Sequence, residues 1–344
     1  MSTALAPWPA SIPSVSTIGA PRAMARPRRV MFDVMRLAAA YSIVWLHTPR
    51  STALHGSMVL GRSAVPFFAA ATVFFVWQGL VDSPGRGWLA YAATRFRRIY
   101  VPFMAWSAIY LAFKAVKASA LPNEPNDFPG WEFLWTGSFY HLWFMPFILV
   151  VSLSVACLGR LVIGSKIIEI GTAIFCLVAG IAIAVLPIPA VIVGTSAAFA
   201  YSALPAVCWG VTLSVACHRG RTDLVQNSVA AVLGLIMAAA CTTWVWHYGR
   251  DNLAENLAGI GCMFAALAPW SARALVTLAR LGSLAYGIYL SHLLFIKSAE
   301  AGLSKLGADK TWQLDLLVFV TAAIGSTALA WCLTQTRYTR WLVA

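Results

Sequence analysis

The chain has 344 residues, of which 60% are hydrophobic and 11% charged, with a mean hydropathy of +0.75. This composition excludes a soluble globular protein, because a soluble surface of this size needs far more charge. The formal net charge of +13 does not indicate nucleic-acid binding, because the basic residues form short clusters between apolar runs. Such clusters are typical of cytoplasmic loops beside an anionic leaflet. We therefore expect a protein that spans a lipid bilayer many times and binds no nucleic acid.

Residues 1–29 are rich in Pro, Ala and Ser and end in a basic cluster. No continuous apolar stretch precedes that cluster, so the segment is not a cleavable secretory signal. We expect a disordered cytoplasmic tail at 1–29, followed by one integral membrane domain at 30–340.

Ten apolar runs follow, and each predicts a transmembrane helix of roughly 20 residues. They lie at 30–48, 60–81, 99–117, 141–159, 167–187, 190–217, 227–247, 256–271, 281–300 and 313–336. The segment from Pro187 to Pro189 predicts a tight turn between the fifth and sixth helices. The expected fold is therefore an all-α polytopic membrane bundle of about ten helices.

The distribution of charge predicts the orientation of this bundle. With the N-terminus inside, 16 of the 25 Lys and Arg residues fall on the inner side and eight on the outer side, and Arg36 lies within the first helix. Positive charge concentrates on the cytoplasmic side of membrane proteins. We therefore expect an inner-membrane protein with both termini inside (N-in/C-in).

The longest connection, 118–140, combines prolines with many aromatic residues and is expected on the outer side. One interpretation is an aromatic belt at the membrane interface. The other is a lid or a stacking platform for a sugar at the mouth of a cavity.

The first helix contains three ionisable residues, Asp33, Arg36 and His47, although such residues are costly in a bilayer and often functional. Arg36 and His47 are 11 residues apart, about three turns and a rise of about 16 Å, so they share one face. Asp33 is placed to pair with Arg36. Arg36 could instead extend to the inner headgroups, and His47 could be an interfacial residue. The functional alternative is that the imidazole accepts a proton and the guanidinium holds an anion.

Three further motifs stand at or within predicted helices. Arg95 and Arg98 belong to a basic cluster before Pro102, which either sets the topology or grips phosphate oxygens. His141 opens the fourth helix, and His292 lies well inside the ninth, where a buried imidazole needs a partner. The simpler interpretation of both histidines is a structural one, as packed and hydrogen-bonded residues. The seven cysteines show no metal-binding spacing, and we expect no metal site.

Together these segments resemble the membrane-bound acyltransferase family 3, which modifies bacterial surface polysaccharides and related molecules. The matching features are an Arg and a His with ten residues between them in the first helix, an arginine-rich helix entry before a proline, a His-Leu-Trp-Phe motif and a Tyr-Gly-Ile-Tyr-Leu-x-His motif. In this chain they are Arg36 with His47, Arg95 to Pro102, His141 to Phe144, and Tyr286 to His292. One departure is the run Ala69-Ala70-Ala71, where the family commonly has Ser-Gly. Small residues at these positions still allow close helix approach.

The resemblance implies an acyltransferase that takes its acyl group from cytoplasmic acyl-CoA, with acetyl-CoA as the default and no permanently bound cofactor. The acceptor would be a hydroxyl of a saccharide or lipid-linked glycan, for export or at the cell surface. His47 would be the general base and Arg36 would hold the donor near the reaction centre. Arg95 and Arg98 would bind the coenzyme A phosphates, and Asp33, His141 and His292 would support the site.

Two rivals come from other classes. The first is a membrane carrier or exporter of a glycan intermediate, since buried charge also suits a transporter. The chain shows no second copy of the Asp-x-x-Arg…His helix, whereas many transporters consist of two related halves. The second is a non-catalytic scaffold, which needs no Arg36 and His47 on a common face.

Overall fold

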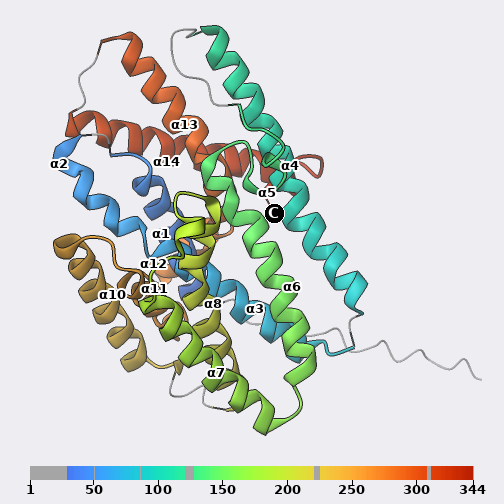
Figure 1. Ribbon diagram of the computed structural model, residues 1–344. Coiled ribbons are helices and arrows are strands. Elements are labelled where there is room, and N and C mark those ends of the chain that lie inside the picture. The colour runs from blue at the N-terminus through green and yellow to red at the C-terminus, as the bar shows by residue number, and fades with distance from the viewer. Residues whose placement is uncertain are drawn as a thin grey trace, which may run out of the picture.

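The computed structural model describes residues 29–49, 51–85, 87–120, 128–220, 225–307 and 311–343 (Figure 1). Every regular element in these ranges is a helix, which confirms the all-α prediction for this part of the chain. The predicted tail at 1–29 lies outside the described residues except for Arg29, whose guanidinium sits 5.2 Å from the centre of the Phe74 ring.

Each of the ten predicted runs coincides with a helix of at least 15 residues. These are α1 (Val30–Leu46), α3 (Ala64–Asp82), α4 (Trp88–Ala120), α6 (Phe144–Val162), α7 (Lys166–Val185), α8 (Ser196–His218), α10 (Ser228–Tyr248), α11 (Asn252–Ala266), α13 (Ala285–Lys305) and α14 (Trp312–Thr334). Short helices connect them: α2 (Thr52–His55), η1 (Gly56–Gly61), α5 (Phe133–Thr136), η2 (Tyr140–Trp143), η3 (Ala190–Ile192), α12 (Arg273–Gly282) and η4 (Arg340–Leu342).

Within the described residues, seven helices are long and apolar enough to cross a membrane. The number rises to eight if α12 and α13, which meet at an angle of 62°, form one broken span. Two of the remaining predicted spans are short helices, since α1 has 17 residues and α11 has 15. The protein is therefore a polytopic helical bundle with at least seven candidate spans.

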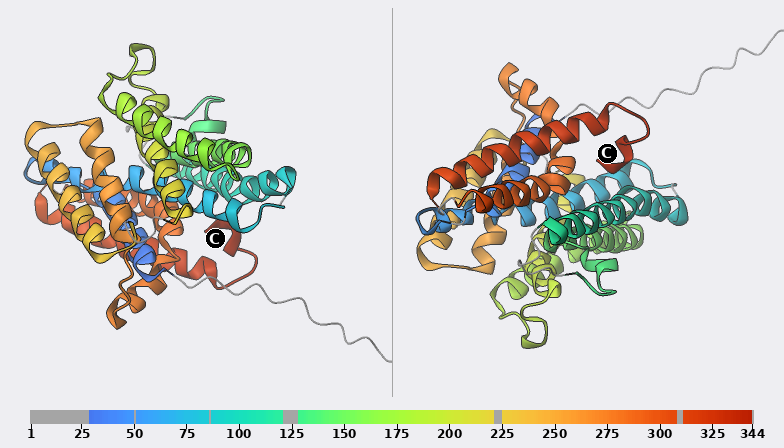
Figure 2. Two further views of the ribbon diagram at one scale, coloured as in Figure 1. Left: turned by 90° about the horizontal axis from the view of Figure 1, so that it is seen from below. Right: turned by 90° about the horizontal axis from the view of Figure 1, so that it is seen from above.

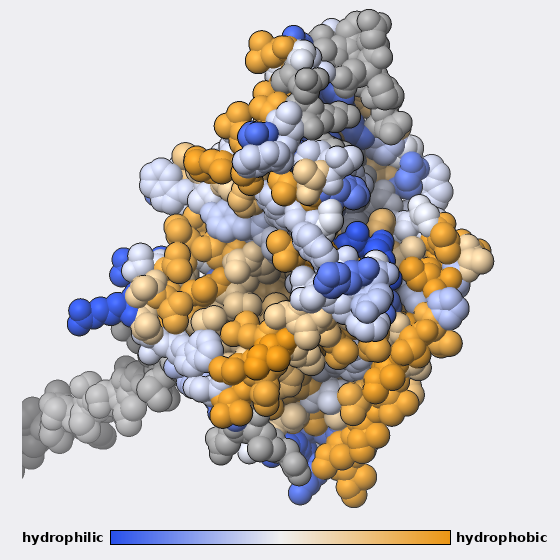
Figure 3. Space-filling view, turned by 90° about the vertical axis from the view of Figure 1, so that its left-hand side faces the viewer, coloured by the Kyte–Doolittle hydropathy of each residue, from blue (hydrophilic) through white to orange (hydrophobic). Residues whose placement is uncertain are grey.

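The helices divide into central and peripheral ones. The most apolar windows of α3 and α8 are 61% and 56% buried, whereas those of α7 and α10 are 22% and 17% buried. The two further views show α7 and α10 at the outside of the bundle (Figure 2). Broad apolar areas cover the face drawn in Figure 3, and hydrophilic side chains gather in smaller patches. Apolar side chains on the outer helices therefore suit contact with lipid.

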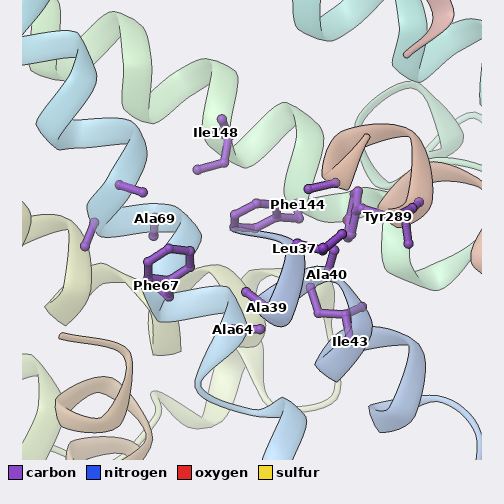
Figure 4. Close-up of a cluster of buried hydrophobic side chains, with 14 of the residues drawn as sticks. Leu37, Ala39, Ala40, Ile43, Ala64, Phe67, Ala69, Phe144, Ile148 and Tyr289 are labelled. Carbon is purple, nitrogen blue, oxygen red and sulfur yellow. The ribbon is translucent and has the colours of Figure 1, made fainter. Parts of the chain in front are cut away.

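Small residues bring the central helices close together. A Cβ atom added to Gly210 on α8 would lie 3.0 Å from the Cα of Ala70 on α3. Ala69 and Ala70 are fully buried, so the run that departs from the family pattern still permits close packing. Around this contact lies one hydrophobic cluster shared by α1, α3, α6 and α13, in which Figure 4 shows Phe144 and Tyr289 beside Ala40.

Two predicted boundaries are wrong. The turn at Pro187–Pro189 is not tight, because α7 ends at Val185 and α8 begins only at Ser196. Pro189 starts the 3₁₀ turn η3, and Gly194, with a φ of +81°, ends the turn in a left-handed conformation before α8 begins. In addition, α4 begins 11 residues before the predicted 99, at Trp88, so the arginine cluster is helical.

Candidate functional site

Three histidines from distant parts of the sequence meet at one end of α1. His47 follows the last residue of α1, His141 lies in η2, and His292 lies in α13. The ring centres of His47 and His292 are 5.4 Å apart in a stacked arrangement, and those of His141 and His292 are 5.1 Å apart. The structure therefore brings together three of the residues singled out in the sequence.

The hydrogen bonding of His292 defines its tautomer. Its Nδ1 lies 2.7 Å from the backbone oxygen of Tyr289, and a carbonyl oxygen can only accept, so Nδ1–H donates. In the neutral ring Nε2 then carries the lone pair. Within the described residues, Nε2 of His292 and both nitrogens of His141 are buried and make no hydrogen bond of good geometry. A buried nitrogen with an unused lone pair is a candidate for proton transfer.

Neighbouring helices hold the two buried histidines in place. The Tyr289 hydroxyl donates a short hydrogen bond to the backbone oxygen of His141, which joins α13 to η2. The hydroxyl of Tyr110 on α4 donates to the backbone oxygen of Leu290 at 2.8 Å. Both tyrosines are buried. These bonds fix α4, α13 and η2 relative to one another at the histidine cluster.

His47 connects this cluster to a cavity of about 290 Å³. Its Nδ1 lies 3.4 Å from the hydroxyl of Tyr140, and the two rings meet edge to face. Both residues line the cavity, as does His141. The imidazole of His47 is therefore positioned to contact a molecule in the cavity, and the stacked ring of His292 lies beside it.

One wall of the cavity is aromatic. Trp143 of η2 stacks on Phe199 of α8 with ring centres 5.8 Å apart, and both line the cavity with Phe144. A small number of polar groups on a mostly apolar lining is typical of sites for small molecules.

The cavity lining also contains a group of charged residues. Glu255 of α11 accepts hydrogen bonds from Arg62 at 3.1 Å and from Arg250 at 3.4 Å, both at Oε1. All three residues line the cavity. Sequence reasoning missed them as site residues, because Arg62 and Glu255 are 193 positions apart.

Asn256, next to Glu255, is hydrogen-bonded to the backbone of α8. Pro205 lies inside that helix. The Ala206 N–H donates to Oδ1 of Asn256 at 3.1 Å, and Nδ2 of Asn256 donates to the Ser202 carbonyl at 2.8 Å. The amide thus bridges two backbone groups of α8 that stand on either side of Pro205. Asn256 and Ser202 both line the cavity, so this contact fixes one part of its wall.

The predicted pair of Asp33 and Arg36 is present at the other end of α1. Nη1 of Arg36 lies 3.5 Å from Oδ1 of Asp33. Arg36 is not among the residues that line the cavity at His47. The structure therefore does not place Arg36 and His47 in this one cavity, although both belong to α1.

Arg95 and Arg98 also lie away from the histidine cavity. Arg95 donates from Nε to the hydroxyl of Tyr91 at 3.1 Å and lies 5.2 Å from the centre of that ring. Arg160 of α6 lies 5.3 Å from the centre of the same ring. Arg98 is exposed. The basic cluster is thus larger than predicted, because a second helix contributes Arg160.

The aromatic connection before η2 divides into two parts. Tyr140 lines the cavity, as expected for a platform at its mouth. Trp131 and Trp135 are exposed and meet edge to face at 4.6 Å, away from the cavity lining. Residues 121–127 of this connection lie outside the described residues, and both interpretations of it stay predictions.

Comparison with known proteins identifies the family. The acyltransferase family 3 model, described as an acyltransferase domain, matches residues 30–335. Neither the curated proteins nor the solved structures contain a significant match. Family membership favours an enzyme over a carrier or a scaffold. With a match that covers nearly all of its membrane region, the chain belongs to acyltransferase family 3 and is a multi-pass membrane acyltransferase.

Proposed function

We propose that the protein transfers an acyl group from cytoplasmic acyl-CoA to a hydroxyl of a saccharide or lipid-linked glycan at a bacterial inner membrane. The observation that supports this proposal most is His47 in the wall of a cavity, with the His292 ring stacked on it and His141 edge to face with His292. An imidazole beside a space for a substrate suits general base catalysis of attack by a hydroxyl.

The reaction follows from this arrangement. His47 takes the proton from the acceptor hydroxyl as its oxygen attacks the thioester carbon. The carbon–sulfur bond breaks, the thiolate leaves, and His47 returns the proton to the sulfur. The products are the acyl ester and coenzyme A. General base catalysis of this kind contributes about a hundred- to ten-thousandfold in rate.

The donor would bind at the inner end of the bundle. Arg95 and Arg98, with Arg160 beside Arg95, offer guanidinium groups that bind phosphate oxygens well. Arg36 would hold the polar part of the donor arm. Because Arg36 precedes His47 by about 16 Å along α1, the acyl arm must extend beside this helix. Acetyl is the default acyl group.

For the topology we propose ten spans with both termini inside. The helices at all ten predicted positions and the positive-inside pattern support this arrangement. Single-cysteine labelling from outside the cell tests it. With the seven native cysteines replaced, a cysteine introduced at the exposed Tyr248, the last residue of α10, should react with an impermeant reagent, and one at the exposed Lys166, the first residue of α7, should not. The reverse pattern would overturn the orientation.

Replacement of His47 tests the function. The purified protein is given acetyl-CoA and a glycan extract, and release of the thiol is measured. Wild-type protein should release it only with glycan, and His47→Ala should release almost none. His247→Ala is the matched control, because His247 is exposed at the end of α10. Equal thiol release by wild type and His47→Ala would remove His47 from the mechanism.

A further inference from the structure

The charged wall of the cavity holds more positive than negative charge. Arg62 and Arg250 both contact Oε1 of Glu255, so two guanidiniums share one carboxylate. The side chain of Glu255 is 10% exposed, that of Arg62 26% and that of Arg250 59%. The three groups together carry a net charge of +1, and the most exposed guanidinium is that of Arg250.

A structural role for Glu255 does not account for both arginines. Glu255 lies in the first turn of α11, where the helix dipole already favours a negative charge. Arg62 at 3.1 Å supplies the cation that a largely buried carboxylate needs, and joins the end of η1 to α11. Arg250 is 3.4 Å from the same oxygen, which leaves most of its five N–H donors for another acceptor.

The rest of the cavity lining is mostly apolar and offers a surface for a sugar ring beside the charged residues. The stacked rings of Trp143 and Phe199 give the cavity an apolar wall. The volume of about 290 Å³ is at the small end of the range for ligand sites, so the cavity admits about one sugar unit. A sugar unit with an acidic substituent can pack its ring on the aromatic wall and direct the anionic group to the guanidiniums, because arginine binds carboxylate and phosphate by paired hydrogen bonds.

We propose that Arg62 and Arg250 form an anion subsite, so that the acceptor is a saccharide unit with a carboxylate or phosphate group. This inference rests on the proposed function, since it assigns the cavity to the acceptor. The anion fixes the orientation of the sugar and presents a hydroxyl to His47, which lines the same cavity.

Ligand-observed NMR on the purified full chain tests the subsite with three probes: methyl glucoside, the methyl glycoside of glucuronic acid, and glucose 6-phosphate. The two anionic sugars should bind at least about fivefold more tightly than the neutral one. Their ratio distinguishes a carboxylate from a phosphate ligand. Equal binding of all three, or binding of none, would overturn the proposal.

Substitutions test whether the preference for anionic sugars comes from the arginines of the charged wall. Arg250→Gln, which removes an exposed side chain with one contact to Glu255, should abolish the preference for anionic sugars, and Arg62→Gln should do the same if the variant stays folded. Lys305→Gln is the matched control, because Lys305 is an exposed cation at the end of α13. A preference that persists in Arg250→Gln would place the anion elsewhere and contradict the proposal.

The same preparations separate this proposal from the proposed function. Selective binding of anionic sugars without thiol release from acetyl-CoA would leave the subsite standing and contradict the acyl transfer. Acyl transfer without any preference for anionic acceptors would support the function and overturn the subsite.

Discussion

Replacing Asn256 with alanine should both destabilise the protein and weaken acceptor binding. Asn256 is 1% exposed, and its amide bonds to the Ala206 N–H and to the Ser202 carbonyl on either side of Pro205. The substitution removes the Asn256 partner from both backbone groups, of which Ala206 is buried and Ser202 half-buried. A buried group that loses its hydrogen-bond partner costs about 1–3 kcal/mol. Side-chain hydrogen bonds in membrane proteins measure at the low end of such ranges, so we expect about 2 kcal/mol.

Fluorescence-detected size-exclusion chromatography after heating measures this effect in detergent. The matched control is Asn227→Ala, the same substitution at the N-cap of α10, where the side chain accepts one hydrogen bond from Ala230. Loss of an N-cap costs about 1 kcal/mol. Asn256→Ala should therefore melt at a lower temperature than Asn227→Ala and should alone raise the KM for the acceptor. Equal melting temperatures with an unchanged KM would refute the bracing role of Asn256.

Three further predictions concern packing and the histidine cluster. Gly210→Ala should lower the free energy of unfolding by about 1–3 kcal/mol, because the new Cβ meets Ala70 at 3.0 Å. The control is Gly79→Ala on α3, which has no atom within 4 Å and should be neutral or stabilising in the same thermal assay. His292→Asn should lower kcat about ten- to a hundredfold with little change in KM, less than loss of a general base, and an unchanged kcat would exclude His292 from catalysis. Tyr140→Phe removes a hydroxyl that lies 3.4 Å from Nδ1 of His47, and should reduce kcat/KM about two- to tenfold, the value of one modest hydrogen bond. A loss beyond about a hundredfold would show that Tyr140 acts directly on the substrate.

The helices could be predicted from the sequence because a long hydrophobic run is itself the requirement for a helix in lipid. All ten runs coincide with helices, although α1 and α11 are shorter than a full span. The predicted helix boundaries were wrong where the local backbone geometry sets the end of a helix. Gly194 ends the turn after Pro189, and α4 continues through the basic cluster because charged residues at a membrane edge do not interrupt a helix.

The site was predicted only in part. His47, His141 and His292 were singled out individually, as polar residues in apolar surroundings, and the structure adds that their rings are in contact. The charged wall could not be predicted, because the pairing of Arg62 with Glu255 joins residues 193 positions apart. Single-sequence periodicity carries no information on which helices are neighbours. Family resemblance suggested Arg36 for the reaction centre, and its place outside the cavity lining leaves it a proposed donor residue.

Mass spectrometry of glycans tests the central claim most directly. Glycans are compared from cells that produce the wild-type protein, His47→Ala at matched abundance in the membrane, or neither. Acyl transfer with His47 as the base predicts an acyl mass, by default acetyl, that appears on a saccharide with the wild-type protein alone. The same acyl mass in cells with His47→Ala, at the wild-type level, would contradict it.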